Sequence, residues 1–301
     1  MRAPFVGTLC PARDGRRHAA IVLFGGSQGG DPLHDFARDF AAHGYVAASV
    51  QYFGGLGTPP TLVDVPVEIG GGVVDALRAR SDVDPQRIAL FGTSKGGEYA
   101  LLVAATYPTV KAVIAATPTP FSWYGLGAGS MPTGCSWSQG GKPLPCVPQS
   151  AEAKRQVADM FVTHKPLAFV TSYDQSRADS GAVEAAFFSL ERIGGPVLCL
   201  AGEDDQMWNA RAHCALAMAY LRGRHHPYPD ATLSLPGAGH VFLIARKGPR
   251  SAVNSVRFGG YEMRFGGTPD ADAAAASVAW PKIYAFLDAA FAPIAPGPPS
   301  P

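Results

Sequence analysis

Residues 87–105 read Arg87-Ile88-Ala89-Leu90-Phe91, then Gly92-Thr93-Ser94-Lys95-Gly96, then Gly97-Glu98-Tyr99-Ala100-Leu101-Leu102-Val103-Ala104-Ala105. The first part is short and apolar and predicts a strand, whereas the third has the composition of a helix. A G-x-S-x-G turn between a strand and a helix is the context of a nucleophile elbow, in which a tight, strained turn lifts the serine hydroxyl clear of the sheet. The stretch therefore predicts Ser94 as a nucleophile for hydrolysis or acyl transfer. An ordinary βα turn with a capping serine is the alternative interpretation.

A second G-x-S-x-G occurs at Gly25-Gly26-Ser27-Gln28-Gly29, after an apolar run. A loop follows it rather than a helix, so the context does not favour Ser27 as the nucleophile. Glycines let backbone N–H groups come close to a ligand, which suits an oxyanion hole. We expect its donors to be the N–H of Lys95 and that of Gly26 or Ser27. A phosphate-binding loop is disfavoured because the chain has no G-x-x-x-x-G-K-[ST] motif.

A nucleophilic serine needs a base, and the base needs a carboxylate to orient it. The predicted strand 196–202 runs into Glu203, Asp204 and Asp205. Sites in open α/β sheets collect just past the carboxyl ends of the strands. Asp205 is the preferred acid and Asp204 the next candidate. A helix cap or a solvated turn before Trp208 is the structural alternative.

The base is predicted from position among the eight histidines. His240 lies just past the predicted strand 231–236, after a glycine-rich turn and downstream of the acid. Three other histidines precede the serine, and His225 and His226 lie in a polar stretch before the strand. The chain order Ser94, Asp205, His240 therefore predicts His240 as general base.

Composition bounds the class of protein. The chain has 301 residues, 47% of them hydrophobic, and a formal net charge of +1. A sizeable core is expected, and the charge gives no argument for nucleic acid or a membrane surface as partner. No apolar run reaches the roughly 18 residues of a membrane span, and residues 1–5 lack the apolar core of a signal peptide. We therefore expect a cytoplasmic protein.

The five cysteines are Cys10, Cys135, Cys146, Cys199 and Cys214, and none has the C-x-x-C spacing of a metal or redox site. Cys135 and Cys146 flank one loop and could form a disulfide, although free thiols are expected in a cytoplasmic protein. The predicted chemistry needs neither a metal nor a bound cofactor.

Strand and helix patterns alternate, which predicts an α/β fold with a mostly parallel sheet and helices on both faces. The predicted strands are 19–25, 45–51, 87–92, 111–117, 196–202 and 231–236. The predicted helices are 33–43, 67–80, 95–107, 151–163, 207–222 and 277–291. We expect a hydrolase core in two parts, 1–117 and 191–292, and a flexible Pro-rich tail, 293–301.

Residues 118–190 interrupt this alternation with a segment rich in Gly, Pro, Ser and aromatic residues. We interpret it as a lid insertion over the active site, because long excursions from a compact domain are usually functional. A structural excursion with its own small core is the alternative. The predicted substrate-binding residues are Phe53, Trp123, Tyr124, Trp137 and Trp208.

Several blocks together resemble the C-terminal domain of the acyl-CoA thioesterase and bile acid-CoA:amino acid N-acyltransferase family of the α/β-hydrolase superfamily. The blocks are Ser94–Glu98, Gln51–Gly57, Val65–Glu68, Gly140–Pro145, Gly202–Trp208 and Pro236–His240. The resemblance spans roughly residues 19–290 and implies the α/β-hydrolase fold with a lid. It also implies Ser94 as nucleophile, Asp205 as acid and His240 as base. The serine is similar to the thioesterase branch, since the N-acyltransferases use a cysteine.

The expected function is hydrolysis of an acyl thioester, acyl-CoA to free acid and CoA, by a serine hydrolase of lipid metabolism. The expected partner is thus a small-molecule acyl ester or thioester. A carboxylic-ester or dienelactone-hydrolase-like enzyme with the same three residues is the alternative. A ligand-binding protein without activity is disfavoured by the intact set of three residues.

Overall fold

The central sheet has the strand order β1-β3-β2-β5-β6-β11-β12 in a computed structural model, which describes residues 5–258 and 260–292. Neighbouring strands from β3 to β12 pair in parallel, and β1 adds to one edge in antiparallel. The strands are β1 (Gly7–Cys10), β2 (His18–Phe24), β3 (Val46–Val50), β5 (Val83–Thr93), β6 (Ala112–Ala116), β11 (Val197–Gly202) and β12 (Ala231–Leu235).

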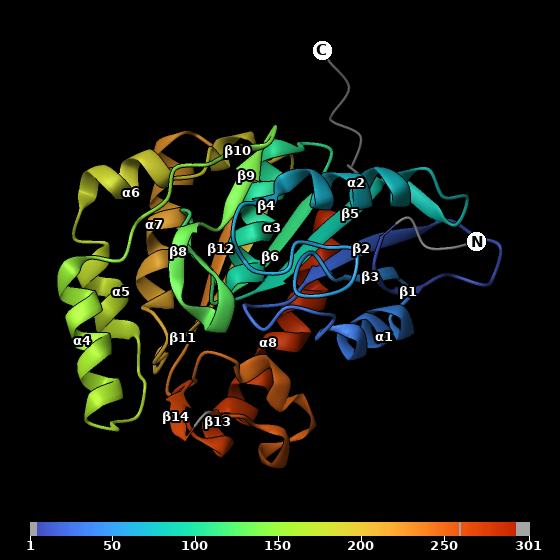
Figure 1. Cartoon of the computed structure of the whole chain (residues 1–301). Coiled ribbons are helices and arrows are strands. Elements are labelled where there is room, and N and C mark those ends of the chain that lie inside the picture. The colour runs from blue at the N-terminus through green and yellow to red at the C-terminus, as the bar shows by residue number, and fades with distance from the viewer. Residues whose placement is uncertain (1–4, 259, 293–301) are drawn as a thin grey trace.

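Helices connect these strands and cover both faces of the sheet (Figure 1). The helices are α1 (His34–Ala42), α2 (Val67–Arg78), α3 (Lys95–Thr106), α4 (Ala151–Val162), α5 (Val170–Ser176), α6 (Ser180–Ala186), α7 (Ala210–Gly223) and α8 (Pro269–Ala290). Short 3-10 turns are η1 (Ala128–Ser130), η2 (Leu190–Arg192), η3 (Phe242–Lys247) and η4 (Pro249–Ser251). No helix in these described ranges is long and apolar enough to cross a membrane.

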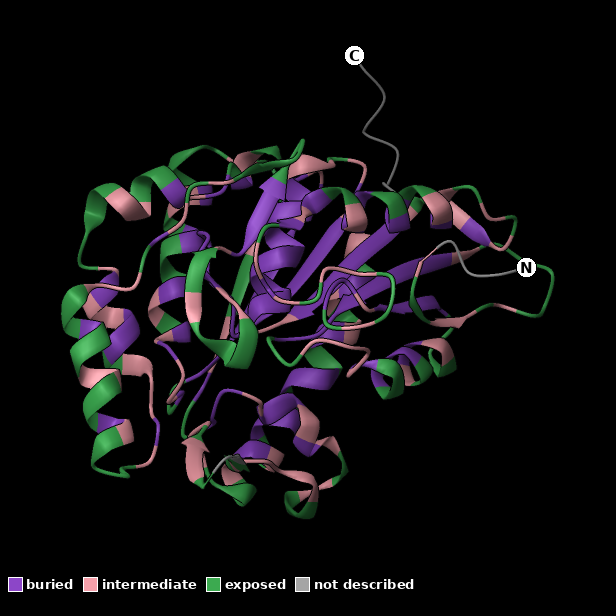
Figure 2. Ribbon diagram, viewed as in Figure 1, coloured by how far each residue is buried: buried purple, intermediate pink, exposed green. Residues whose placement is uncertain are grey.

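The side chains of β2 alternate between two hydrophobic cores. Val22 and Phe24 pack on the side of α2, α3 and α7, whereas Ile21 and Leu23 pack on the side of α1 and α8. All four side chains are fully buried. A strand that is apolar on both faces is expected when helices cover both sides of a parallel sheet. Figure 2 shows the result as buried strands enclosed by helices whose outer faces are exposed.

The predicted core strands and their parallel pairing are confirmed. The first strand and the start of the last helix differ from the prediction. The antiparallel strand β1 was not predicted. Helix α8 begins at Pro269 instead of near residue 277, because the Thr268 hydroxyl caps it by accepting from the Ala271 N–H at 3.2 Å. Proline in the first turn, just after a threonine, is a common helix start. The predicted tail 293–301 lies outside the described residues.

Residues 118–190 fold against the core. They contribute the small strands β7 (Tyr124–Leu126), β8 (Pro132–Cys135), β9 (Trp137–Gln139) and β10 (Lys142–Pro143), and the helices α4 to α6. Strand β9 pairs with β4 (Val65–Pro66), which precedes α2, so the insertion is hydrogen-bonded to the core. A disulfide joins Cys135 to Cys146, so the expectation of free thiols is wrong for this pair. A further hairpin, β13 (Ser255–Phe258) and β14 (Tyr261–Arg264), precedes α8.

Candidate active site

Ser94 lies at the tip of the turn between β5 and α3, with φ 56° and ψ −125°. A non-glycine residue at positive φ is strained, and such strain clusters at functional sites. The flanking glycines make the turn possible. A Cβ at Gly92 would come within 2.0 Å of the Gly96 carbonyl oxygen, and one at Gly96 within 2.1 Å of the Phe24 carbonyl oxygen. The predicted strand–turn–helix context is therefore present around Ser94.

His240 lies between Ser94 and Asp205. Its Nε2 is 2.8 Å from the Ser94 Oγ, and its Nδ1 is 2.8 Å from the Asp205 Oδ2. A carboxylate can only accept, so Nδ1 carries the proton and Nε2 accepts from the serine hydroxyl. Both His240 and Asp205 are more than nine-tenths buried. In this hydrogen-bonded line the imidazole can act as a base toward the serine hydroxyl, and the carboxylate can orient the imidazole.

The three acids after β11 have different partners. Asp205 Oδ1 accepts from the N–H groups of Met207 at 2.8 Å and Trp208 at 3.2 Å, which leaves Oδ2 for His240. Asp204 points elsewhere and accepts from the Gly267 N–H at 2.9 Å. Glu203 accepts from a hydroxyl on β12. Asp205 therefore fits both interpretations: one carboxylate oxygen caps the turn, and the other faces the His240 imidazole.

One carbonyl group joins two loops, the one after β11 that carries Asp205 (the acid loop) and the one after β12 that carries His240 (the base loop). The Phe265 carbonyl oxygen accepts from the His240 N–H at 2.8 Å and from the Gln206 N–H at 3.3 Å. The chain approaches so closely that a Cβ at Gly266 would come within 1.8 Å of the Asp204 carbonyl oxygen. Phe265 and Gly266 are not predictable from the sequence, because nothing local in residues 265–267 indicates which loops they meet.

The loop after β2 lies beside the serine. A Cβ at Gly26 would come within 3.2 Å of the Ser94 Cβ, and the Tyr52 hydroxyl donates to the Gly25 carbonyl at 2.6 Å. Lys95 begins α3, and the first N–H groups of a helix have no carbonyl partner within it. The structure therefore brings the predicted oxyanion-hole residues Gly26 and Lys95 to Ser94, while the Ser27 side chain is exposed.

A buried ion pair lies behind the elbow, and sequence analysis missed it. Lys95 Nζ is 2.8 Å from both carboxylate oxygens of Glu98, and both side chains are at most 3% exposed. Glu98 also accepts from Thr119 Oγ1 at 2.9 Å, the Trp123 N–H at 3.1 Å and Trp137 Nε1 at 2.6 Å. Burial lowers the pKa of Lys95, and Glu98 opposes that shift. Two opposite charges three residues apart at the start of an otherwise apolar helix were the available signal.

The predicted substrate-binding aromatics are all buried, at 6% exposure or less: Phe53, Trp123, Tyr124, Trp137 and Trp208. Trp137 lies on the Lys95–Glu98 pair, with Lys95 Nζ 5.1 Å from its ring centroid. Trp208 packs edge-on against the His240 ring at 5.1 Å and donates to the Thr117 carbonyl at 3.0 Å. These contacts are those of a packed core, and a role in substrate binding stays a prediction.

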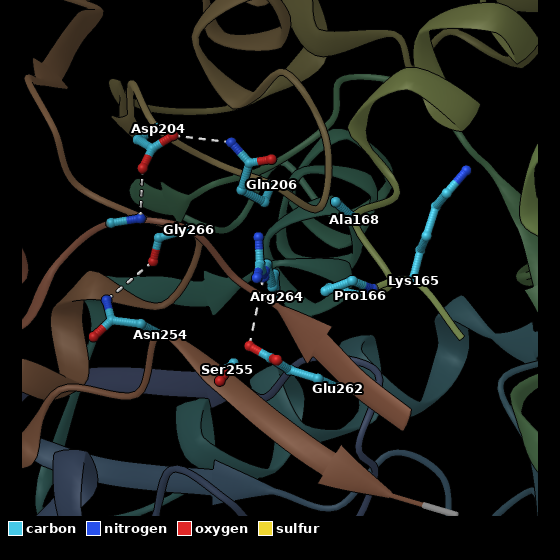
Figure 3. Close-up of a pocket in the computed structure, with 11 residues that line it drawn as sticks. Lys165, Pro166, Ala168, Asp204, Gln206, Asn254, Ser255, Glu262, Arg264 and Gly266 are labelled. Atoms are coloured by element: carbon cyan, nitrogen blue, oxygen red, sulfur yellow. Dashed lines mark hydrogen bonds and ion pairs between the residues drawn. The ribbon is translucent and has the colours of Figure 1, made fainter. Parts of the chain in front are cut away.

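A cavity of about 590 Å³ lies between residues 165–168, the loop that carries Asp204 and the hairpin β13–β14 (Figure 3). Its polar lining residues include Asp204, Gln206 and Asn254, with Glu262 and Arg264 from β14. Ser94 and His240 do not line it, so it is separate from the reacting atoms. Among the described residues no cluster of three or more His, Cys, Asp or Glu side chains is arranged to hold a metal ion.

The comparisons with known proteins agree on the family. The sequence profile of the family "BAAT / Acyl-CoA thioester hydrolase C terminal" matches residues 72–293. Human acyl-coenzyme A thioesterase 6 is 25% identical over 92% of this chain and 61% of its own length. Mouse acyl-coenzyme A amino acid N-acyltransferase 1 is 24% identical over 82% of this chain and 54% of its own length. The chain thus spans little more than half the length of these curated relatives.

Solved structures agree on the fold. A putative dienelactone hydrolase from Klebsiella pneumoniae has a TM-score of 0.55 at 15% identity, with 95% of both chains covered. A puromycin-hydrolyzing peptidase from Mycobacterium tuberculosis has a TM-score of 0.56 at 16% identity, over 93% of this chain and 35% of that one. The chain has the α/β-hydrolase fold and belongs to the BAAT / acyl-CoA thioester hydrolase C-terminal family.

Proposed function

We propose that this protein is a serine hydrolase that cleaves acyl thioesters, converting acyl-CoA to the free acid and CoA. The observation that carries the proposal is the line of hydrogen bonds from Ser94 Oγ through His240 to Asp205, at 2.8 Å each. The names of the curated thioesterase relatives support the choice of a thioester. A thiolate is also a better leaving group than an alkoxide, so thioester cleavage suits a mechanism without a Lewis acid.

In the first step His240 Nε2 takes the Ser94 hydroxyl proton while Oγ forms a bond to the acyl carbon. The negative charge on the carbonyl oxygen is stabilised by the N–H groups of Lys95 and of Gly26 or Ser27. The carbon–sulfur bond then breaks, and the proton on His240 goes to the departing sulfur. Asp205 keeps the imidazole in the correct tautomer and stabilises the transient imidazolium.

In the second step water attacks the acyl-enzyme ester. His240 Nε2 takes a proton from that water, and the new bond forms at the acyl carbon. The bond to Ser94 Oγ breaks, the proton passes from His240 to Oγ, and the free acid departs. The enzyme returns to its starting state with one water consumed. No residue changes its oxidation state.

We extend the proposal to the insertion, residues 118–190, as a lid over the acyl group. Its support is the attachment to Glu98, four residues after the nucleophile, through Thr119, Trp123 and Trp137. The cytoplasmic location and a role in lipid metabolism stay predictions from the sequence and the resemblance.

The test is thiol release from a series of acyl-CoA esters, short to long, beside p-nitrophenyl esters of the same acids. Ser94→Ala removes the nucleophile, and Ser277→Ala, an exposed serine on α8, is the matched control. We expect CoA thioesters to have the higher kcat/KM, with activity lost in Ser94→Ala and kept in Ser277→Ala. Equal or reversed preference would contradict the thioesterase assignment and favour a carboxylic-ester hydrolase with the same nucleophile.

A further inference from the structure

A second buried carboxylate lies next to the base loop. Asp272 is in the first turn of α8 and is 1% exposed. Its Oδ1 accepts from the Gly239 N–H at 2.8 Å, and Gly239 directly precedes His240. Its Oδ2 accepts from Asn254 Nδ2 at 2.7 Å. Asp272 therefore touches the backbone that carries the base without touching the imidazole.

Asn254 links this carboxylate to Phe265, whose carbonyl oxygen accepts from the His240 N–H. Its Nδ2 also donates to the Gly266 carbonyl at 3.0 Å, as Figure 3 shows. The backbone carbonyl oxygen of Asn254 accepts from the Phe265 N–H at 2.7 Å. Both partners of Nδ2 are acceptors, which fixes the orientation of the amide. Hydrogen bonds run from Asp272 to Asn254, on to Phe265 and then to the His240 N–H. The hydrogen bond from Gly239, which precedes His240, back to Asp272 closes the ring.

The close packing around Asp272 indicates that its contact with Gly239 is specific. A Cβ at Gly267 would come within 2.5 Å of Asp272 Oδ1 and 2.6 Å of the Gly239 nitrogen. A Cβ at Gly239 would come within 2.3 Å of the Gly266 carbonyl oxygen. Only glycines at these positions let the carboxylate reach the base loop at hydrogen-bond distance.

A buried carboxylate is a costly way to hold a loop. Burial raises the pKa of Asp272, and its hydrogen bonds from Gly239 and Asn254 act in the opposite direction. A charge removed from water costs free energy unless its partners compensate for the lost hydration. Its place in the first turn of α8 adds a favourable interaction with the helix dipole. The hydrogen bonds and the helix dipole offset this cost, and the hydrogen bond to the Gly239 N–H holds that part of the backbone in place.

We propose that Asp272 is a positioning residue that holds the His240 backbone so that the imidazole reaches both Ser94 and Asp205. The inference rests on the proposed role of His240 as base. The imidazole must meet two partners at once, and a misplacement of about 1 Å in such a group can lower a rate about 100-fold.

The experiment compares Asp272→Asn with Asp270→Asn. Asp270 is exposed in the same helical turn, so both variants remove one charge from the same helix N-terminus. In Asp272→Asn the amide nitrogen must face either Asn254 Nδ2 or the Gly239 N–H, and either contact places donor against donor. We expect kcat per active site, counted by labelling Ser94 with a fluorophosphonate, to fall about 10- to 100-fold with little change in KM. Asp270→Asn should match the wild type.

A spectroscopic readout that needs no substrate distinguishes a positioning role of Asp272 from unfolding of the variant. It also tests that role independently of the proposed function. The low-field proton resonance of His240 Nδ1–H reports its hydrogen bond to Asp205 without any substrate, and His240→Ala assigns it. We expect this resonance to shift or broaden in Asp272→Asn and to be unchanged in Asp270→Asn. If no acyl ester is cleaved by the wild type but the resonance changes in this way, the positioning role stands and the proposed function fails.

Equal kcat per labelled site and an unchanged resonance in Asp272→Asn would overturn the inference. If that variant does not fold, Asn254→Ala carries the test, because it removes the partner that orients Oδ2, so that the Asp272 carboxylate is free to turn away from Gly239. We expect the same direction of change in Asn254→Ala, with a smaller size. A wild-type resonance in Asn254→Ala would then overturn the inference.

Discussion

Ser94 and His240 are held in place by different kinds of structure. The position of Ser94 follows from one continuous stretch, in which β5, the glycines around the turn and α3 adjoin in sequence. The position of His240 depends on separate segments, since its N–H bonds to Phe265 and its Nδ1 faces Asp205. One half of the site is therefore local in sequence, and the other half is assembled by the fold.

This difference predicts how each half of the site responds to a substitution. A local turn fails by steric conflict, because its backbone atoms leave no room for a new atom. An assembled loop fails by loss of alignment, because its hydrogen bonds can be removed one at a time while the sheet persists.

The largest effect is expected from Asp205→Asn in the assembled half. The amide would favour the wrong tautomer of His240, and a loss of this kind lowers kcat about 10,000-fold in serine hydrolases that use three such residues. Asp204→Asn, one residue away, should lower kcat less than about tenfold, because Asp204 faces Gly267 and Gln206. Steady-state kinetics with an acyl-CoA ester measures both. A larger loss in Asp204→Asn than in Asp205→Asn would reverse the assignment of the acid.

Gly96→Ala should have the next largest effect, and on folding rather than on alignment. Its Cβ would lie 2.1 Å and 2.2 Å from two backbone carbonyl oxygens, so relaxation requires the elbow to move. We expect the free energy of unfolding to fall by about 4 kcal/mol or more. Gly72→Ala is the control, since a Cβ there meets nothing within 4 Å and α2 should gain about 0.5–1 kcal/mol. Chemical denaturation of both variants measures the contrast, and equal stabilities would refute it.

The same contrast explains what the sequence could predict. The core strands, Ser94 and the order of the acid and base follow from patterns that are local or that fall at strand ends. Phe265, Asp272 and the Glu98 network depend on contacts between distant segments, which no periodicity records. The aromatic residues of the insertion were predicted to bind substrate, whereas the structure buries Trp123 and Trp137 against Glu98. The residue type alone does not distinguish an aromatic side chain in the core from one that lines a pocket.

Glu98→Gln tests the buried ion pair between Lys95 and Glu98 in the local half. The variant keeps acceptors for Trp123 and Trp137 but leaves the buried Lys95 ammonium without a countercharge. Breaking a buried pair in this way should cost about 3 kcal/mol of stability. Glu184→Gln, at an exposed position on α6, is the matched control and should unfold like the wild type. If Glu98→Gln is as stable as Glu184→Gln, the Lys95–Glu98 pair does not stabilise the fold.

The smallest effect concerns acid stability, through the buried His213 on α7. Burial is the main cause that lowers the pKa of His213 to about 3, while its ordinary value is 6.5. The unfolded chain therefore binds a proton at this residue as the pH falls below 6.5, and the folded chain does so only near pH 3. A lowered folded pKa contributes stability above the unfolded value that is lost as the pH falls. His213 should then remove about 2 kcal/mol of stability between pH 7 and pH 5.

Urea denaturation of the wild type and of His213→Gln at the two pH values measures this share. Gln keeps a polar side chain of similar size and does not titrate, so its stability should fall by about 2 kcal/mol less than that of the wild type over this interval. His225→Gln is the control, because His225 is exposed and should leave the pH dependence unchanged. If His213→Gln and His225→Gln have the same pH dependence of stability, burial of His213 does not lower the acid stability of the fold.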